Sequence, residues 1–409
     1  MASLFRLLPW LRPWKPLAFT NTDFPRIAPN VKIEEEHFPD YMASRYYPVQ
    51  IGQVLQDRYQ IVGKLGFGAY STVWLARDLP GRQHVALKLF ITAESIGEHL
   101  DNELGMYRRI AQTKSSHPGR RSIRQLLDSF DIDGPDGSHR CLVHPPLWDS
   151  VDTLLHRNPI RRLPPQIISV VLNHVLLALD FLHTECQMIH TDIKADNIML
   201  AIGDDSVFTA FEEDEFNDPS PRKVLDDGRS IYLSRQLRMP KYLGAPVLCD
   251  FGSAVLGDVE HREDVQPDIY RAPEVILGAS WSYPIDIWNV ACMVWTNFEG
   301  GGLFSGLDPE EQRYCGRTHI AEIMALLGPP PAEHVRDGRE SHRFFMESSD
   351  VQKDIALPAP KSLQEREISL EGEDQRKFLA MMDRMLQWDP AKRASAKELA
   401  EDDWIKLYR

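Results

Sequence analysis

Four polar residues in two short segments have the types and spacing needed to transfer a phosphoryl group. Residues 190–197 hold Asp192, Lys194 and Asn197, and Asp250 follows further along the chain. One carboxylate can accept or steer a hydroxyl proton, and an ammonium can offset charge on the moving group. A carboxamide and a second carboxylate can hold magnesium. The set predicts Asp192 and Lys194 as catalytic residues, Asn197 and Asp250 as Mg²⁺ ligands, and ATP as the donor.

A glycine-containing turn between two apolar stretches lies upstream. Gly66 and Gly68 have no Cβ, so the backbone there can approach phosphates closely. Taken alone, such a turn is also typical of an ordinary hairpin. The predicted ATP-covering segment comprises Leu65, Gly66, Phe67, Gly68, Ala69, Tyr70, Ser71, Thr72 and Val73.

Lys88 favours phosphate binding as the role of this turn. It ends the apolar stretch 85–88, which also contains Ala86. In phosphoryl-transfer signatures, a lysine at this place binds the α- and β-phosphates and pairs with a glutamate on the next helix. Glu103 lies in a predicted helix over 99–107 and is the expected partner. Glu98 and Asp101 are the competing carboxylates.

Further segments make the resemblance specific. The chain resembles eukaryotic-type protein kinases, and among them the SR protein kinases, especially their fungal relatives. Thr191 stands where most protein kinases have arginine, and this variant is typical of SR protein kinases. Segments 45–49, 52, 58–59 and 71–75 are also similar to that family, whereas 270–274 and 327–330 are similar to the larger kinase group that also holds cyclin-dependent and mitogen-activated kinases. The resemblance implies a serine/threonine kinase acting on arginine/serine-rich proteins, many of which function in mRNA splicing.

The resemblance also implies an α+β, bilobal fold: a small antiparallel β-sheet lobe with one helix, then a larger, mainly helical lobe. The expected parts are an N-terminal extension over 1–40, an N-lobe over 41–144 and a C-lobe over 145–409. Short apolar alternations up to about residue 142 favour strands, and residues 167–183 favour a long apolar helix.

The family pattern assigns roles at the junction of the two lobes. His144 takes the gatekeeper position, where a bulky apolar or aromatic residue is usual, and it either tunes access or simply forms a pocket wall. The Pro145 carbonyl and the Leu147 N–H are expected to bind adenine. Pro146 has no N–H to offer, and the pattern asks for none there.

The resemblance also implies three structural residues, and at one position the sequence departs from the family pattern. Glu274 and Arg393 match a buried ion pair, and Asp286 matches an aspartate that braces the catalytic loop. Pro267 stands where a threonine usually bonds the catalytic aspartate and lysine. This loss leaves open a pseudokinase scaffold as the alternative function, next to a related kinase with a different substrate motif.

Composition bounds the partners. The formal charge of −14 disfavours a general nucleic-acid surface and suits basic protein substrates, although acidic proteins are also common for solubility. No uninterrupted apolar run approaches ~18 residues, so no membrane span is expected. The five cysteines lack paired short spacing, which fits a reducing compartment. We expect a monomer in the cytoplasm, the nucleus or both.

Three segments leave alternatives open. Residues 1–20 are basic without acids, so they are either a mitochondrial targeting peptide or a disordered or surface-packed extension. The insert at about 203–245 looks too polar for a core of its own and is either a docking or localisation element or a solvated surface loop. The activation segment, 250–274, offers few hydroxyls, and Thr191 cannot pair with a phosphate. We therefore expect activity without loop phosphorylation.

Overall fold

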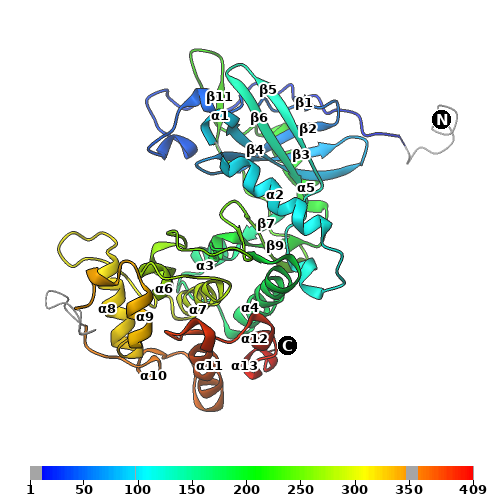
Figure 1. Ribbon diagram of the computed structural model, residues 1–409. Helices are drawn as coiled ribbons and strands as arrows, with labels where there is room; N and C mark the ends of the chain where they lie inside the picture. The colour runs from blue at the N-terminus through cyan, green and yellow to red at the C-terminus, as the bar shows by residue number, and fades with distance from the viewer. Residues whose placement is uncertain (1–11, 97, 347–357, 409) are drawn as a thin grey trace. The chain divides into compact units, whose positions relative to one another are not determined.

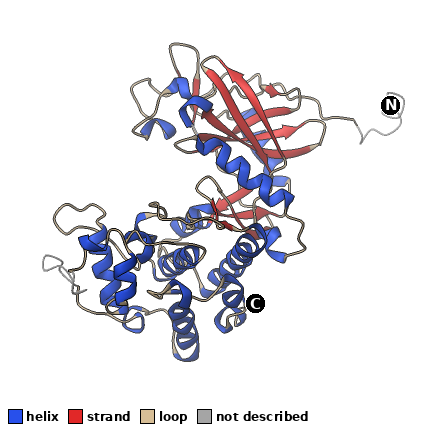
Figure 2. Ribbon diagram, viewed as in Figure 1, coloured by secondary structure: helices blue, strands red, loops and turns tan. Residues whose placement is uncertain are grey.

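The computed structural model describes residues 12–96, 98–346 and 358–408. The chain divides into two compact units (Figure 1). The first contains Met1–Tyr107, Arg124–Asp149 and Leu200–Gly244, and the second contains Arg108–Ile123, Ser150–Met199 and Ala245–Arg409. Strands gather in the first unit and helices in the second (Figure 2), as expected for the predicted α+β class.

The first unit is built on a six-stranded antiparallel sheet of order β1-β2-β3-β4-β6-β5. Its strands are β1 (Val54–Leu55), β2 (Tyr59–Phe67), β3 (Ser71–Asp78), β4 (Gln83–Thr92), β5 (Asp128–Gly134) and β6 (Gly137–His144). The helices that follow β4 are α1 (Ala93–Ile96) and α2 (Glu98–Gln112). This unit also contains α5 (Ser206–Asn217), β10 (Arg222–Val224) and β11 (Ser230–Tyr232).

Both faces of strand β3 in this sheet are buried, whereas an antiparallel sheet often leaves one face in water. Leu75 and Ala76 are neighbours on β3, so their side chains point to opposite faces, and both are fully buried. One cluster of buried residues joins the sheet to Val49 of the N-terminal segment and to Tyr232 of β11. The N-terminal segment and the 200–244 region are therefore part of the folded unit.

The surface insert of the C-lobe was expected at about 203–245, and nearly all of it falls in Leu200–Gly244, which groups with the sheet. On α5, Phe208 and Phe211 are buried. A Cβ on Gly63 of β2 would lie 2.8 Å from Phe211 Cε1, so the glycine lets the helix approach the strand. Lys64, the next residue of β2, is itself 1% exposed, and its carbonyl accepts a hydrogen bond from Arg235 N–H (2.9 Å).

The helices of the second unit are α3 (Val151–Arg157), α4 (Pro165–Asp180), α6 (Pro273–Ile276), α7 (Pro284–Glu299), α8 (Gly316–Leu327), α9 (Ala332–Asp337), α10 (Leu363–Arg366), α11 (Gly372–Met385), α12 (Ala396–Ala400) and α13 (Asp403–Lys406). Helix α7 is buried almost all round, which marks it as the central core helix. The short strands β8 (Met188–Ile189) and β13 (Val255–Leu256) pair antiparallel. A further sheet of order β12-β9-β7 comprises β7 (Leu147–Ser150), β9 (Ile198–Ile202) and β12 (Leu243–Leu248).

One helical stretch, Pro165–Cys186, is long and apolar enough to cross a membrane, and more than half of its most apolar part is buried inside the protein. A core helix of a soluble protein passes the same test, so this stretch is weak evidence for a membrane span. The expected targeting function of residues 1–20 falls partly on 1–11, which lie outside the described residues. Residues 12–20 include Leu17, whose backbone exchanges two hydrogen bonds with the buried side chain of Gln60, each 2.8 Å long.

Candidate active site

Lys88 and Glu103 meet in the first unit. Lys88 lies on β4 between Val73 of β3 and Leu142 of β6. Its Nζ donates to Glu103 Oε1 at 2.9 Å and to Oε2 at 2.8 Å, with both side chains largely buried. The side chains of Glu98 and Asp101 lie outside what the structure describes. The pair holds one ammonium in a fixed place on the sheet, as binding of phosphate oxygens requires.

The glycine-rich loop, residues 65–73, contains the end of β2, the turn at 68–70 and the start of β3. Gly68 N–H donates to the Ser71 carbonyl at 2.8 Å, which closes the turn. A Cβ on Gly66 would meet none of the described atoms within 4 Å. The protein's own atoms therefore do not require glycine at position 66, and the open space suits a closely approaching ligand.

His144 ends β6 opposite Ala86 on β4, with Pro145 and Leu147 following it. Its Nδ1 lies 2.8 Å from the Gln125 carbonyl, and its ring packs against Tyr107. Burial, with Arg124 and Lys88 nearby, holds the pKa of His144 well below its usual range. The His144 ring is therefore neutral and donates from Nδ1 to the Gln125 carbonyl. It is fully buried and packs as part of the interior of the first unit.

In the second unit, Asp192 receives two hydrogen bonds on one carboxylate oxygen. Lys194 Nζ donates to Asp192 Oδ2 at 2.8 Å, and Asn197 Nδ2 donates to the same atom at 2.9 Å. Asn197 Nδ2 also donates to the Asp192 carbonyl at 2.9 Å. The three predicted residues are thus brought together within the loop that leads into the 3₁₀ turn Ala195–Asn197.

Asp286 holds the backbone just before Asp192. It lies in the first turn of α7, where the helix dipole favours a carboxylate, and its side chain is fully buried. The backbone N–H groups of His190 and Thr191 each donate to it at 2.8 Å. Thr191 has a φ of 67°, which is costly for a β-branched residue. The bonds to Asp286 offset that strain.

Asn197 and Asp250 fit a magnesium site with few protein ligands. Because Asn197 Nδ2 is bonded to Asp192, its side-chain oxygen is the atom that can face a cation. Asp250 is exposed and has a φ of 65°. Within the described ranges, no group of three or more His, Cys, Asp or Glu could hold a metal. Mg²⁺ typically takes one or two protein ligands together with phosphate oxygens and water, and the side-chain oxygens of Asn197 and Asp250 are of the type that could serve.

Glu274 and Arg393 form a buried bidentate pair. Arg393 Nη1 and Nη2 lie 2.5 Å and 2.7 Å from the two carboxylate oxygens of Glu274. Both side chains are at most 2% exposed. The pair joins the end of the activation segment to the C-terminal part of the chain.

The model of the protein kinase domain family matches residues 59–405. A serine/threonine protein kinase of Aspergillus fumigatus is 39% identical over 413 residues, covering 99% of both chains. The serine/threonine-protein kinase SRPK of Physarum polycephalum is 30% identical over 398 residues, covering 91% of each chain.

This chain belongs to the protein kinase family. It is a serine/threonine protein kinase, as predicted, and its relatives include SRSF protein kinase 3 of Mus musculus, 26% identical over 515 residues with 91% of this chain and 90% of the relative covered. The family uses ATP and Mg²⁺.

Several residues of the kinase's second unit support the site but were not selected from the sequence. His183 Nε2 lies 2.9 Å from Asp286 Oδ2. His190 Nε2 lies 3.1 Å from the Cys249 carbonyl, and Asp192 N–H donates to His190 Nδ1 at 3.3 Å. The His190 ring therefore links the catalytic loop to the residue before Asp250. Only the adjacency of these histidines to the motif could have suggested them.

The activation segment is held to the catalytic loop by hydrogen bonds. Thr191 Oγ1 donates to the Ser253 carbonyl at 2.8 Å, and Gly257 N–H donates to the Gln187 carbonyl at 2.9 Å. Pro267 has no side-chain donor. Next to it, Gln266 has a φ of 76°. Its side-chain Nε2 donates to the Ile285 carbonyl, and its Oε1 accepts from the Ala272 N–H, each at 2.8 Å.

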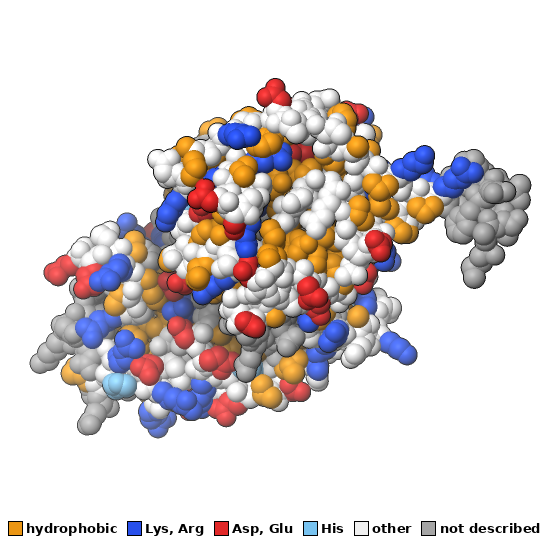
Figure 3. All heavy atoms as spheres, turned by 90° about the horizontal axis from the view of Figure 1, so that it is seen from above, with side chains coloured by type: hydrophobic (Ala, Val, Ile, Leu, Met, Phe, Trp, Pro, Cys, Tyr) orange, Lys and Arg blue, Asp and Glu red, His pale blue; other side chains and the backbone are white. Residues whose placement is uncertain are grey.

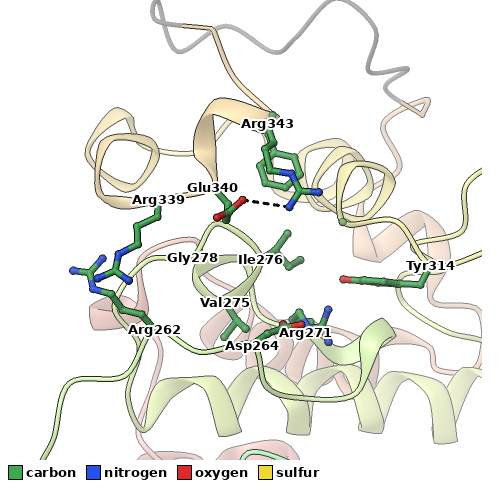
Figure 4. A pocket seen from close by; sticks show the side chains of 12 residues that line it. Arg262, Asp264, Arg271, Val275, Ile276, Gly278, Tyr314, Arg339, Glu340 and Arg343 are labelled. Atoms are coloured by element: carbon green, nitrogen blue, oxygen red, sulfur yellow. Dashed lines mark hydrogen bonds and ion pairs between the residues drawn. The ribbon is translucent and has the colours of Figure 1, made fainter.

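A cavity of about 450 Å³ lies beside the activation segment in the second unit (Figure 4). Its charged lining consists of Arg262, Asp264, Arg271, Arg339, Glu340 and Arg343. Arg343 pairs with Glu340 at 3.3 Å, and Arg271 pairs with Asp264 at 3.1 Å. The lining thus carries more basic than acidic groups.

Proposed function

We propose that this kinase transfers the γ-phosphate of ATP, in the presence of Mg²⁺, to serines of arginine/serine-rich proteins linked to mRNA splicing. Its relatives include proteins named SRPK and SRSF protein kinase, one of them 30% identical over 91% of both chains. The observation that carries the chemistry is the shared Asp192 oxygen, which binds both Lys194 and Asn197.

The roles follow from phosphoryl-transfer chemistry. Asp192 orients or deprotonates the substrate hydroxyl, and Lys194 stabilises negative charge on the transferred group. Lys88, held by Glu103, positions the α- and β-phosphates. Asn197 and Asp250 would hold Mg²⁺, which neutralises charge between the phosphates.

Overall charge supports a basic substrate in a general way. The formal charge of −14 favours encounter with cationic peptides. On the face seen in Figure 3, acidic and basic side chains are interspersed rather than gathered by sign. Attraction would therefore act through the overall field, with a monomeric enzyme in the cytoplasm or nucleus as the proposed setting.

The test compares an arginine/serine repeat peptide with two matched peptides, one with lysine for arginine and one with alanine for serine. Magnesium-dependent phosphate incorporation is expected only where serine is present, with arginine preferred over lysine. The Lys88→Met variant should abolish incorporation. Equal rates on the arginine and lysine peptides would reject the proposed substrate class.

The charge of the cavity beside the activation segment favours a second candidate, a kinase of the same group with a different substrate motif. Four arginines line that cavity, and like charges there would repel an arginine-rich segment. An array that varies the residues flanking serine would separate the two. Preference for acidic flanking residues would support this second candidate.

A further inference from the structure

The tip of the glycine-rich loop carries two exposed aromatic side chains next to two glycines. Phe67 and Tyr70 are 43% and 59% exposed, and Gly66 and Gly68 have no side chains to pack. Among the described residues, the backbone bonds at the tip include Gly68 N–H to the Ser71 carbonyl at 2.8 Å and Ile91 N–H to the Tyr70 carbonyl at 2.9 Å. Holding this loop in one conformation therefore calls for support from elsewhere in the first unit.

Two aromatic residues of the N-terminal segment provide such contacts. The Tyr46 hydroxyl donates to the Ala69 carbonyl, at the tip of the loop, with an O···O distance of 3.0 Å. The Phe38 ring meets the Phe67 ring edge-on, with centroids 6.1 Å apart. These contacts lie 23 and 29 positions apart in sequence, so they exist only because the N-terminal segment folds back onto the sheet.

The segment that carries Phe38 is fixed by buried charge. The 3₁₀ turn Glu34–His37 places Glu34 and Glu35 against Lys64, whose Nζ lies 2.7 Å and 2.5 Å from their carboxylates. Lys64 is only 1% exposed and is two residues before Gly66. Buried ions need such partners, because leaving one unpaired is costly.

The 200–244 region also holds the turn Glu34–His37 in place. Lys223 Nζ, also buried, lies 2.7 Å and 2.6 Å from the two carboxylate oxygens of Glu36. Ser234 donates from its N–H and its hydroxyl to Glu34, at 2.6 Å and 2.9 Å. The turn is thus tied on one side to the strand leading into the loop and on the other to the inserted region.

We propose that residues 33–46 form a loop brace, which holds the glycine-rich loop in its nucleotide-binding conformation through Tyr46 and Phe38. Tyr46 is a positioning residue for ATP. Because a peptide unit is planar and trans, holding the Ala69 carbonyl also fixes the direction of the Tyr70 N–H. Backbone N–H groups of such loops bind phosphates, so the brace acts on nucleotide affinity.

The Tyr46 hydroxyl remains a donor at any working pH. Burial, and secondarily the charge of Glu35, raise the pKa of Tyr46 to about 12. The contribution of the brace should therefore be constant between pH 6 and pH 9.

The decisive variant is Tyr46→Phe, with Tyr41→Phe as the matched control. Tyr41 lies in the same segment, its ring is 5.3 Å from that of Tyr46, and its N–H donates to the Phe38 carbonyl at 3.2 Å. Loss of one neutral hydrogen bond corresponds to about a three- to tenfold change. Tyr46→Phe should raise the KM for ATP, and the Kd of a fluorescent ATP analogue, by about that factor. The KM for the protein substrate should stay constant in both variants.

Phe38→Leu provides a second variant, in which the bulk is kept and the edge-on ring contact is lost. It should raise the KM for ATP about twofold or more, with faster amide exchange in residues 66–70 in both brace variants. An unchanged ATP KM and Kd in Tyr46→Phe, or an equal rise in Tyr41→Phe, would overturn the proposal. Nucleotide binding is measured without a protein substrate, so the result is independent of the proposed substrate class.

Discussion

At the residue scale, the chemistry depends on which carboxylate oxygen of Asp192 accepts hydrogen bonds from neighbouring side chains. Both side-chain bonds reach Oδ2, and within the described residues none reaches Oδ1. Lys194 and Asn197 therefore hold one side of the carboxylate, and the other oxygen can meet a substrate hydroxyl. The residue types and spacing were enough to select these three side chains from the sequence, because the motif is local.

Asp192→Asn keeps the shape of this side chain and removes its charge. We expect kcat to fall by about 10²–10⁴, since general-base assistance and charge are lost together. The Kd for ATP should be unchanged. Asp196→Asn is the matched control, because Asp196 is an exposed aspartate in the 3₁₀ turn that follows Asp192. A steady-state assay with both variants tests this, and near-normal turnover by Asp192→Asn would contradict the assigned role.

At the scale of elements, the activation segment is joined to the catalytic loop by the β8–β13 pairing and by the Thr191–Ser253 bond. Neither contact requires a phosphate. Thr191 could be recognised from the sequence as unable to form an ion pair, but its bond to Ser253 could not. That bond depends on a positive φ and on residues more than 60 positions apart.

We therefore expect protein made in bacteria and treated with phosphatase to keep most of its activity. Thr191→Val removes the bond to Ser253 while keeping the side chain's shape, and should lower kcat by about three- to tenfold. The measurement is turnover before and after phosphatase treatment. Near-zero turnover that an upstream kinase restores would contradict the prediction.

Helix α5 tests the packing of an inserted element. In Gly63→Ala the new Cβ would lie 2.8 Å from Phe211 Cε1, and crowding of this kind costs roughly 1–3 kcal/mol. Thermal unfolding should show a lower Tm for Gly63→Ala and partial recovery in Gly63→Ala/Phe211→Leu. Gly66→Ala is the control for stability, since none of the described atoms lies within 4 Å of its Cβ. Equal Tm values for all variants would contradict close packing at this position.

At the scale of the whole molecule, the sheet-rich and helical units were predictable, and the membership of residues 200–244 was not. Their composition suggested a polar surface segment. Their place in the first unit depends on Phe211 against Gly63 and on Ser234 against Glu34, pairs separated by up to 200 positions. Local composition carries no information on contacts between such distant residues. The sequence alone therefore could not assign residues 200–244 to the first unit.

Whole-molecule stability should fall on acidification through buried histidines. Burial, and secondarily Arg271, lower the pKa of His319 from 6.5 to about 3. Between those values the unfolded chain binds a proton that the folded chain does not, so stability decreases as the pH falls below about 6.5. For His319 the loss approaches about 1.4 kcal/mol per pH unit at most. His139 and His144 have lowered pKa values for the same main reason, burial.

Denaturant unfolding at pH 7.0, 6.0 and 5.0 measures this slope. His319→Asn should show a shallower pH dependence of the unfolding free energy than the natural chain. An exposed histidine gives the control, and His342→Asn should leave the slope unchanged. Parallel pH profiles for the natural chain and His319→Asn would contradict the assignment.

The buried ammonium of Lys64 bears on where a shortened version of this protein can begin. The kinase family match starts at residue 59, whereas both carboxylates that neutralise Lys64 come from residues 34 and 35. A protein trimmed to the family boundaries would expose a hydrophobic strand with an uncompensated charge inside it. Expression, crystallisation or inhibitor screening should therefore start upstream of Glu34, even though that stretch falls outside the recognised catalytic domain.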